Sequence, residues 1–236
     1  MSFRIGETVL TPNSLMLPLA LAFFFMLSYQ RLYPSVARTR FHAYASLTVA
    51  ALCGALGAWA YGASFSSPEP NALHAWLDVR FGSFGGYWGA VLGGLAYAWV
   101  VAQGTLKTAD ALVPGILIGG SIARIGCVFT GCCRGIAFSA GVPAFPPWPC
   151  YDIAALMLTL GVIVSLQRTM RRCTFPGGTT GLFLTVYGLL RFLAEFLRVM
   201  PAALGPLSSG QVAALIQCLA GPLLLASLTY RTGRTR

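Results

Sequence analysis

Charged residues are scarce in this sequence. Only 9% of its 236 residues are charged and 56% are hydrophobic, whereas soluble domains carry about 25% charged residues. A helix that spans a bilayer needs about 20 mostly apolar residues, so the chain has room for about seven or eight spans and for no separate soluble domain. The composition therefore excludes a soluble protein and predicts an all-α integral membrane protein, with residues 1–236 forming a single polytopic membrane domain.

Lysine, histidine and acidic residues are also few. The chain has one lysine, two histidines and six acidic residues against fifteen arginines. Neither histidine has a recognisable metal-ligand spacing, so we expect no metal and no cofactor. The basic residues cluster at the ends of apolar segments instead of forming a stripe, so we expect no nucleic-acid partner. The first apolar run is already long enough to span a bilayer, and we expect no cleavable signal peptide.

Seven apolar segments are expected to cross the membrane. The loops between them alternate between positive and neutral, and positive loops stay in the cytoplasm. This alternation predicts an outside N-terminus and a cytoplasmic C-terminus. A short interfacial helix is expected near residues 73–79, and Asp110 is expected to cap the fourth segment. The segments cover about 14–33, 43–62, 84–102, 110–131, 151–167, 179–197 and 209–230.

Arg124 lies inside the apolar segment 110–131. An unpaired guanidinium near the middle of a membrane helix costs at least about 2.5–3.5 kcal/mol, so it usually faces a cavity or a partner. Charged residues also occur in and just after the apolar segment 179–197. Tyr187, Arg191, Glu195 and Arg198 are spaced so that they lie on one helical face. Three charges on one face of a membrane helix are not expected to face lipid.

Arg124 and Arg191 are expected at matching depth, roughly 18–24 Å from the cytoplasmic end of their helices. With one acid to share, Glu195, they leave net positive charge in a buried cavity. The phosphate of an anionic phospholipid would balance that charge. The alternative is a structural salt-bridge ladder of Arg191, Glu195 and Arg198 that only holds neighbouring helices together.

Four of the seven cysteines are expected near the outer face, where the compartment is oxidising if the membrane is a bacterial inner (cytoplasmic) membrane. One interpretation is a structural disulfide from Cys150 to Cys132 or Cys133. These four cysteines are Cys127, Cys132, Cys133 and Cys150.

The other interpretation is a reactive thiolate. Either Cys127 or Cys132 would be held by Arg124 or Arg134 and would act as a nucleophile or base, since nearby cations favour the thiolate. Asp152 is expected to cap the fifth segment or to pair with Arg134.

Five stretches resemble the prolipoprotein diacylglyceryl transferase family. Each is similar to a motif of that family, and the last two lie in the sixth segment and at the start of the seventh. The stretches are Ser83-Phe-Gly-Gly-Tyr-Trp-Gly89 (S-F-H-G-G-x-x-G), Asp110-Ala-Leu-Val-Pro114 (D-x-x-x-P), Arg124-Ile-Gly-Cys-Val-Phe-Thr-Gly-Cys132 (R-x-G-N-x-x-N-G-E), Tyr187 to Arg198 (Y-G-x-x-R-x-x-x-E-x-x-R) and Ser209-Gly-Gln211 (S-x-G-Q).

Enzymes of that family take the diacylglyceryl group from phosphatidylglycerol and attach it by a thioether bond to the cysteine of a lipoprotein precursor. The resemblance implies that Arg124 and Arg191 hold the phospholipid head group, while Glu195 and Arg198 orient them. Arg134 and the glycine pair Gly85 and Gly86 are also expected to bind the substrate.

The chain departs from the family pattern around the thiol chemistry. Phe84 replaces the family histidine, Cys127 and Thr130 replace two asparagines, and Cys132 replaces a glutamate. Catalytic groups are therefore sought among Arg124, Arg191, Cys127, Cys132 and Tyr187. The acceptor is a lipoprotein precursor or another nucleophile. A second hypothesis is a lipid-binding or thiol-redox membrane protein that uses the same cavity.

Overall fold

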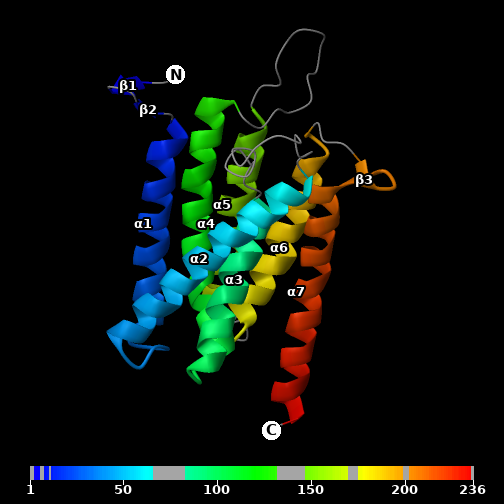
Figure 1. Ribbon diagram of the computed structural model, residues 1–236. Helices are drawn as coiled ribbons and strands as arrows, with labels where there is room; N and C mark the ends of the chain where they lie inside the picture. The colour runs from blue at the N-terminus through cyan, green and yellow to red at the C-terminus, as the bar shows by residue number, and fades with distance from the viewer. Residues whose placement is uncertain are drawn as a thin grey trace. The chain divides into compact units, whose positions relative to one another are not determined.

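The computed structural model describes residues 3–5, 8–10, 12–65, 83–131, 147–169, 175–198 and 202–234. These residues form seven helices and two short antiparallel hairpins (Figure 1). The hairpins pair β1 (Phe3–Ile5) with β2 (Thr8–Leu10) and β3 (Ala202–Leu204) with β4 (Leu207–Ser208). The predicted helical architecture is confirmed. The helices are α1 (Pro12–Leu32), α2 (Arg40–Phe65), α3 (Ser83–Val100), α4 (Thr105–Thr130), α5 (Trp148–Thr169), α6 (Gly178–Glu195) and α7 (Ser209–Arg234).

Five of these helices are long and apolar enough to cross a membrane. The chain is therefore a multi-pass membrane protein. The helices α3 and α6 reach 18 residues each. Whether they also span, and which side each terminus faces, stay predictions. The five candidate spans are Leu15–Leu32, Arg40–Ala63, Thr105–Thr130, Trp148–Thr169 and Ser209–Tyr230.

Three helices begin at least three residues earlier than the apolar pattern suggests, and the first is α2, which starts at Arg40 instead of residue 43. The α4 helix starts at Thr105, so the prediction that Asp110 caps it is wrong, and the exposed Lys107 lies in its first turn instead of in a loop. The α5 helix starts at Trp148 instead of Tyr151. Helical hydrogen bonding continues into the polar flank of a span, as the bond from Thr108 N–H to the Gly104 carbonyl shows (2.9 Å). The predicted interfacial helix at 73–79 lies outside the described residues.

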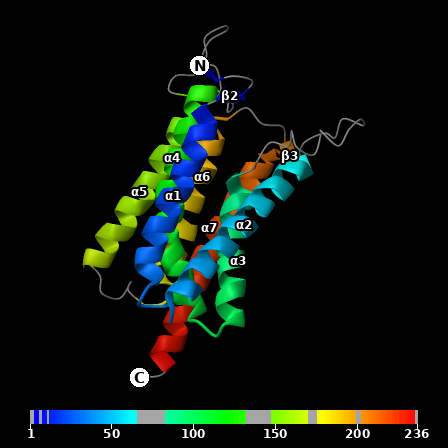
Figure 2. The ribbon, with the colours of Figure 1, turned by 60° about the vertical axis from the view of Figure 1, so that its left-hand side comes forward.

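The contacts group the chain into two compact units. In the unit Leu27–Leu112, α2 and α3 pack with their backbones nearly touching, side by side in Figures 1 and 2. A Cβ added at Gly57 or Gly85 would lie well inside 3.0 Å of the other residue's carbonyl oxygen. The glycine-rich α3 thus serves internal helix packing of the small-xxx-small kind.

The second unit holds residues 1–26 and 113–236, and α6 lies along α7 within it (Figures 1 and 2). This contact is also close, because a Cβ added at Gly188 would lie 2.6 Å from the backbone nitrogen of Cys218. The α5 helix packs on the same α6 helix. Large side chains are fully buried here, among them Trp148, Phe183 and Tyr187. The polar residues of α4, α5 and α6 meet in this unit.

Candidate functional site

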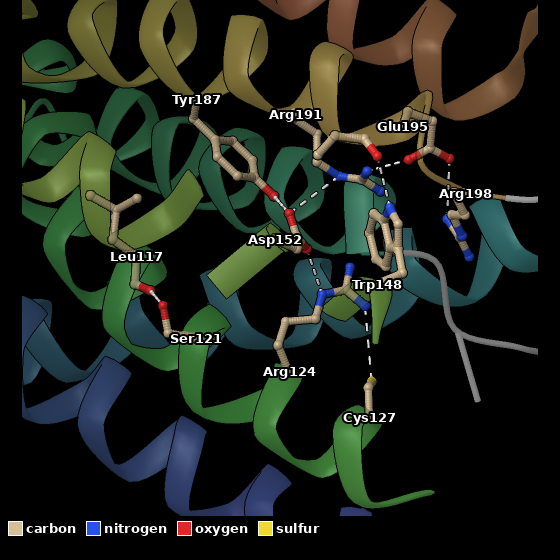
Figure 3. A network of polar contacts seen from close by, with 11 residues as sticks. Leu117, Ser121, Arg124, Cys127, Trp148, Asp152, Tyr187, Arg191, Glu195 and Arg198 are labelled. Atoms are coloured by element: carbon tan, nitrogen blue, oxygen red, sulfur yellow. Dashed lines mark hydrogen bonds and ion pairs between the residues drawn. The ribbon is translucent and has the colours of Figure 1, made fainter. Parts of the chain in front are cut away.

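Asp152 is the centre of a buried polar cluster built by three helices (Figure 3). Its Oδ2 accepts a hydrogen bond of 2.6 Å from Nε of Arg124 on α4. Its Oδ1 accepts a hydrogen bond of 3.0 Å from the Tyr187 hydroxyl and lies 3.4 Å from Nε of Arg191, both on α6. A carboxylate on α5 therefore links the arginine of α4 to the polar face of α6.

Glu195 extends the cluster along α6. Its Oε2 forms an ion pair with Nη1 of Arg191, one turn back, and its Oε1 lies 3.3 Å from Nη1 of Arg198. The salt-bridge ladder of Arg191, Glu195 and Arg198 considered as the structural alternative is therefore present, with Arg198 three residues beyond the end of α6. It is also joined through Asp152 to Arg124, so the ladder is part of a larger network.

The indole ring of Trp148 lies among three guanidinium groups. The distances from its centroid to the Cζ atoms are 4.4 Å for Arg191, 4.7 Å for Arg198 and 5.5 Å for Arg124. Cations at such distances from an indole face are attracted by its quadrupole. The Trp148 Nε1–H donates a 2.9 Å hydrogen bond to the Ala194 carbonyl, which fixes the ring against the end of α6.

The charges of this cluster do not cancel. Among the described residues, three arginines face two carboxylates, those of Asp152 and Glu195. The sequence predicts a net positive charge here with Glu195 as the one acid. The structure adds Asp152 as a second acid, and one positive charge remains. The expectation that Asp152 caps α5 or pairs with Arg134 is also corrected, because Asp152 pairs with Arg124 and Arg191.

Glycine at position 210 lets the Glu195 carboxylate lie against the first turn of α7. A Cβ added at Gly210 would lie 2.7 Å from Cδ of Glu195 and closer still to Oε1. The turn is held by a capping box: Ser208 N–H donates to Gln211 Oε1 (2.8 Å), and Gln211 N–H donates to Ser208 Oγ (3.2 Å). Ser208, not Ser209, is therefore the capping serine of the S-x-G-Q motif. A helix N-terminus favours a neighbouring carboxylate.

Two of the four cysteines expected near the outer face, Cys127 and Cys150, lie among the described residues. Cys127 is half-buried, and its Sγ lies 3.9 Å from Nη1 of Arg124. Cys150 is a free thiol, so the predicted disulfide from it to Cys132 or Cys133 is not formed here. Cys132 and Cys133 themselves lie outside the described residues.

Of the remaining predicted site residues, Arg134 also lies outside the described residues. Gly85 and Gly86 belong to the unit Leu27–Leu112, where they face α2. The described residues contain no group of three or more His, Cys, Asp or Glu side chains placed to hold a metal ion.

Two residues of the cluster were missed from the sequence as site residues. Trp148 and Asp152 are four residues apart, so they lie on one face of α5. A carboxylate in the first turns of an apolar helix, one turn after a tryptophan, is the signal that marks them. Four prolines between residues 143 and 149 indicate a loop around Trp148, and this loop pattern hides the helical spacing of Trp148 and Asp152.

Comparison with known proteins relates this chain to an enzyme family. The family model described as prolipoprotein diacylglyceryl transferase matches residues 1–227. Phosphatidylglycerol–prolipoprotein diacylglyceryl transferase 2 of Clostridium perfringens is 31% identical over 165 residues, covering 64% of this chain and 61% of the relative. The Dehalococcoides mccartyi transferase of the same description is 27% identical over 198 residues, covering 77% of this chain and 72% of the relative. The Pasteurella multocida one is 30% identical over 164 residues, covering 66% and 60%.

Proposed function

Since the chain belongs to the prolipoprotein diacylglyceryl transferase family, we propose that it moves a diacylglyceryl group from phosphatidylglycerol to an acceptor thiol. The relatives' descriptions name phosphatidylglycerol and a prolipoprotein as the two substrates. The acceptor is proposed to be the cysteine of a lipoprotein precursor. We propose that the reaction takes place in the outer half of a bacterial inner membrane. The protein is proposed to be a single membrane domain with seven spans and an outside N-terminus.

The observation that carries this proposal is the net positive charge of the Asp152 cluster inside an apolar helix bundle. Arg191 is 1% exposed and the Asp152 and Glu195 carboxylates are fully buried. Excess charge that is buried to this extent favours an anionic ligand, and guanidinium groups suit phosphate oxygens because they donate bidentate, charge-assisted hydrogen bonds. A phospholipid reaches the site from the membrane, with its acyl chains remaining among the helices.

The proposed step is a nucleophilic displacement at the carbon of the diacylglyceryl group that carries the phosphate ester. The acceptor sulfur forms a C–S bond as the C–O bond to phosphate breaks, and the electron pair leaves with the phosphate as glycerol phosphate. The thiol proton passes to a base. Guanidinium groups fixed by carboxylates stabilise the charge that develops on the leaving phosphate, and their positions are set before the reaction begins.

The base is proposed among Cys127, Cys132 and Tyr187. Tyr187 is fully buried and its hydroxyl donates to Asp152, which supports a role in holding that carboxylate. Cys127 lies beside Arg124, which supports it as the better candidate of the two described residues. Transfer by a Cys127→Ala variant, compared with Cys218→Ala on α7, separates a base at this position from a general need for thiols.

The second candidate function is a lipid-binding or thiol-redox membrane protein. The two cysteines at this end of the unit, Cys127 beside Arg124 and Cys150 on α5, favour it. Oxidation that joined them to each other or to the neighbouring cysteines, without any transfer from lipid, would support this alternative.

The test is transfer from phosphatidylglycerol that carries a radiolabel in its acyl chains, by purified protein in detergent. One arm supplies a lipoprotein-signal peptide with its cysteine, and the other supplies a membrane extract. Label on the peptide supports the proposal in full. Label only on a component of the extract keeps the transferase and changes the acceptor. Binding of the lipid with no transfer in either arm would leave the second candidate.

A further inference from the structure

We propose that the turn between α1 and α2 binds the head group of an anionic phospholipid, and that one acyl chain of this lipid lies along the exposed side of α2. This surface belongs to the unit Leu27–Leu112 and shares no residue with the Asp152 cluster. Binding here is independent of the transfer reaction and of the side of the membrane that the turn faces.

Three exposed arginines gather at this turn. Arg31 lies in the last turn of α1, Arg40 begins α2, and Arg38 lies between the two helices. Residues 12–65 contain no aspartate or glutamate, and none of the three arginines forms an ion pair with any residue that the structure describes. This excess of positive charge favours a phosphate group, with which guanidinium groups form bidentate, charge-assisted hydrogen bonds.

The position of the turn favours a lipid phosphate over a free one. The candidate spans Leu15–Leu32 and Arg40–Ala63 flank the turn, so residues 33–39 connect them at one surface of the bilayer. Figures 1 and 2 show the turn at one end of both helices. The phosphates of neighbouring lipids lie at this level, and basic residues next to a span are attracted to anionic lipids.

Buried residues and capping hydrogen bonds hold the turn in place. Leu32 and Ala37 are almost completely buried. Thr39 caps α2, because its Oγ1 accepts the His42 N–H at 3.2 Å. Nδ1 of His42 lies 2.9 Å from the hydroxyl oxygen of Tyr97, which joins the start of α2 to the last turns of α3. The backbone that carries the arginines is therefore set before a lipid binds, which lowers the entropy cost of binding.

A stack of tyrosine rings extends from Arg40. The Arg40 Cζ lies 5.8 Å from the centroid of the Tyr33 ring. Tyr33 stacks on Tyr29 at 5.9 Å, and Tyr29 stacks on Tyr44 at 4.8 Å between centroids. Tyrosine combines an apolar ring with a polar hydroxyl and is enriched where lipid head groups meet acyl chains. The stack thus lies where the head-group part of the surface meets its acyl part.

The exposed side of α2 supplies the acyl part. Phe41, Tyr44 and Leu52 are each more than half exposed. Together with the exposed Thr48 they are spaced by three or four residues, so they lie on one helical face. The helix rises about 16 Å from Phe41 to Leu52, which is close to one leaflet of the hydrocarbon core, about 15 Å. A cationic end joined to an apolar strip of this length fits one anionic phospholipid.

Photocrosslinking tests this surface in the purified wild-type protein. The protein is placed in phosphatidylcholine nanodiscs with a trace of phosphatidylglycerol that carries a diazirine in one acyl chain. A parallel sample contains phosphatidylcholine with the same diazirine, and adducts are mapped by mass spectrometry. Each arginine near an anionic head group favours binding by about fivefold. We therefore expect the anionic probe to label residues 41–52 about tenfold or more above the zwitterionic probe.

Two double variants separate this surface from net charge. Arg38→Gln/Arg40→Gln is expected to lose the preference for the anionic probe, and the labelling by the zwitterionic probe should stay unchanged. Arg168→Gln/Arg231→Gln removes the same charge from the last turns of α5 and α7 and should keep the preference. Arg38 and Arg40 are exposed, so we expect their variant to keep the thermal midpoint of the wild-type protein.

Equal labelling of residues 41–52 by the two probes in the wild-type protein would overturn the proposal. A preference that survives Arg38→Gln/Arg40→Gln, or one that both double variants lose equally, would overturn it as well. Inorganic phosphate is added in a further arm, with chloride of equal ionic strength as its control. A preference that phosphate abolishes and chloride does not would assign the arginines to a free phosphate ligand. The expected result is that both salts leave the preference in place.

Discussion

Asp152 on α5 accepts the Nε–H of Arg124 on α4 at 2.6 Å, with its own side chain completely buried. The second oxygen of the same carboxylate faces Arg191 and Tyr187 on α6. One carboxylate thus fixes two guanidinium groups from different helices. Both the stability of this unit and the arrangement of its positive charge depend on that residue.

Asp152→Asn is expected to damage both properties. The amide has the same shape but no charge, so Arg124 and Arg191 lose their shared counter-ion. Removing one partner of a buried ion pair costs about 3–5 kcal/mol. We expect a lower thermal midpoint in detergent and at least about a hundredfold loss of transfer, which corresponds to nearly 3 kcal/mol of transition-state stabilisation.

The control for Asp152→Asn is Thr159→Val, two turns along α5. Thr159 is buried, and its hydroxyl bonds to the Ala155 carbonyl of its own helix (2.7 Å). We expect wild-type transfer from this variant. An Asp152→Asn protein with a normal midpoint and normal transfer would show that the cluster does not depend on this carboxylate.

Trp148 is expected to matter more for its ring than for its N–H. Trp148→Phe keeps an aromatic face for the three guanidinium groups but loses the hydrogen bond to Ala194, a net loss of about 1 kcal/mol. Trp148→Leu loses both, and each cation–π contact adds about 0.5–2 kcal/mol. Unfolding free energy and transfer should therefore fall in the order wild type, Phe, Leu. Equal loss in both variants would assign the role to the hydrogen bond alone.

Gly210→Ala is expected to displace the Glu195 carboxylate, because the new Cβ would lie 2.7 Å from its Cδ. Arg198 would then lose its partner, and we expect transfer to fall about tenfold or more. Gly161→Ala on α5 is the matched control, since a Cβ there meets nothing within 4 Å. Alanine favours a helix by about 1 kcal/mol over glycine, so Gly161→Ala should be fully active. Normal activity of Gly210→Ala would show that Glu195 can shift without consequence.

Gly85 and Gly86 offer a matched pair of neighbours on α3. A Cβ at Gly85 would clash with the Gly57 backbone, whereas a Cβ at Gly86 would make ordinary contacts of 3.5 Å with Ala58 Cβ and 3.7 Å with Gly54 O. We expect Gly85→Ala to destabilise the protein by about 1–3 kcal/mol or more and Gly86→Ala to leave its thermal midpoint unchanged. Lost transfer in a stable Gly86→Ala variant would instead support the predicted substrate-binding role of this glycine pair.

The helical class and most helix positions could be predicted from hydropathy, because membrane spans are long uniform segments. The face of α6 that carries Tyr187, Arg191 and Glu195 could also be predicted, since helical spacing alone places these residues together, and Arg198 follows three residues after the end of α6. The carboxylate on another helix that pairs with Arg124 and Arg191 could not be predicted. Asp152 is joined to Arg124 by tertiary packing, and no spacing within one segment encodes that contact. The start of α5 at Trp148 was missed because four nearby prolines indicate a loop.

The most direct test of the account compares Arg124→Gln with Arg168→Gln in the labelled-phosphatidylglycerol assay, with bound lipid measured on the same samples. Each variant removes one positive charge, at the Asp152 cluster in the first case and at the exposed end of α5 in the second. The account predicts that Arg124→Gln loses lipid binding and transfer together, while Arg168→Gln keeps both. Equal lipid binding and transfer by the two variants would contradict the claim that the Asp152 cluster binds the phospholipid head group.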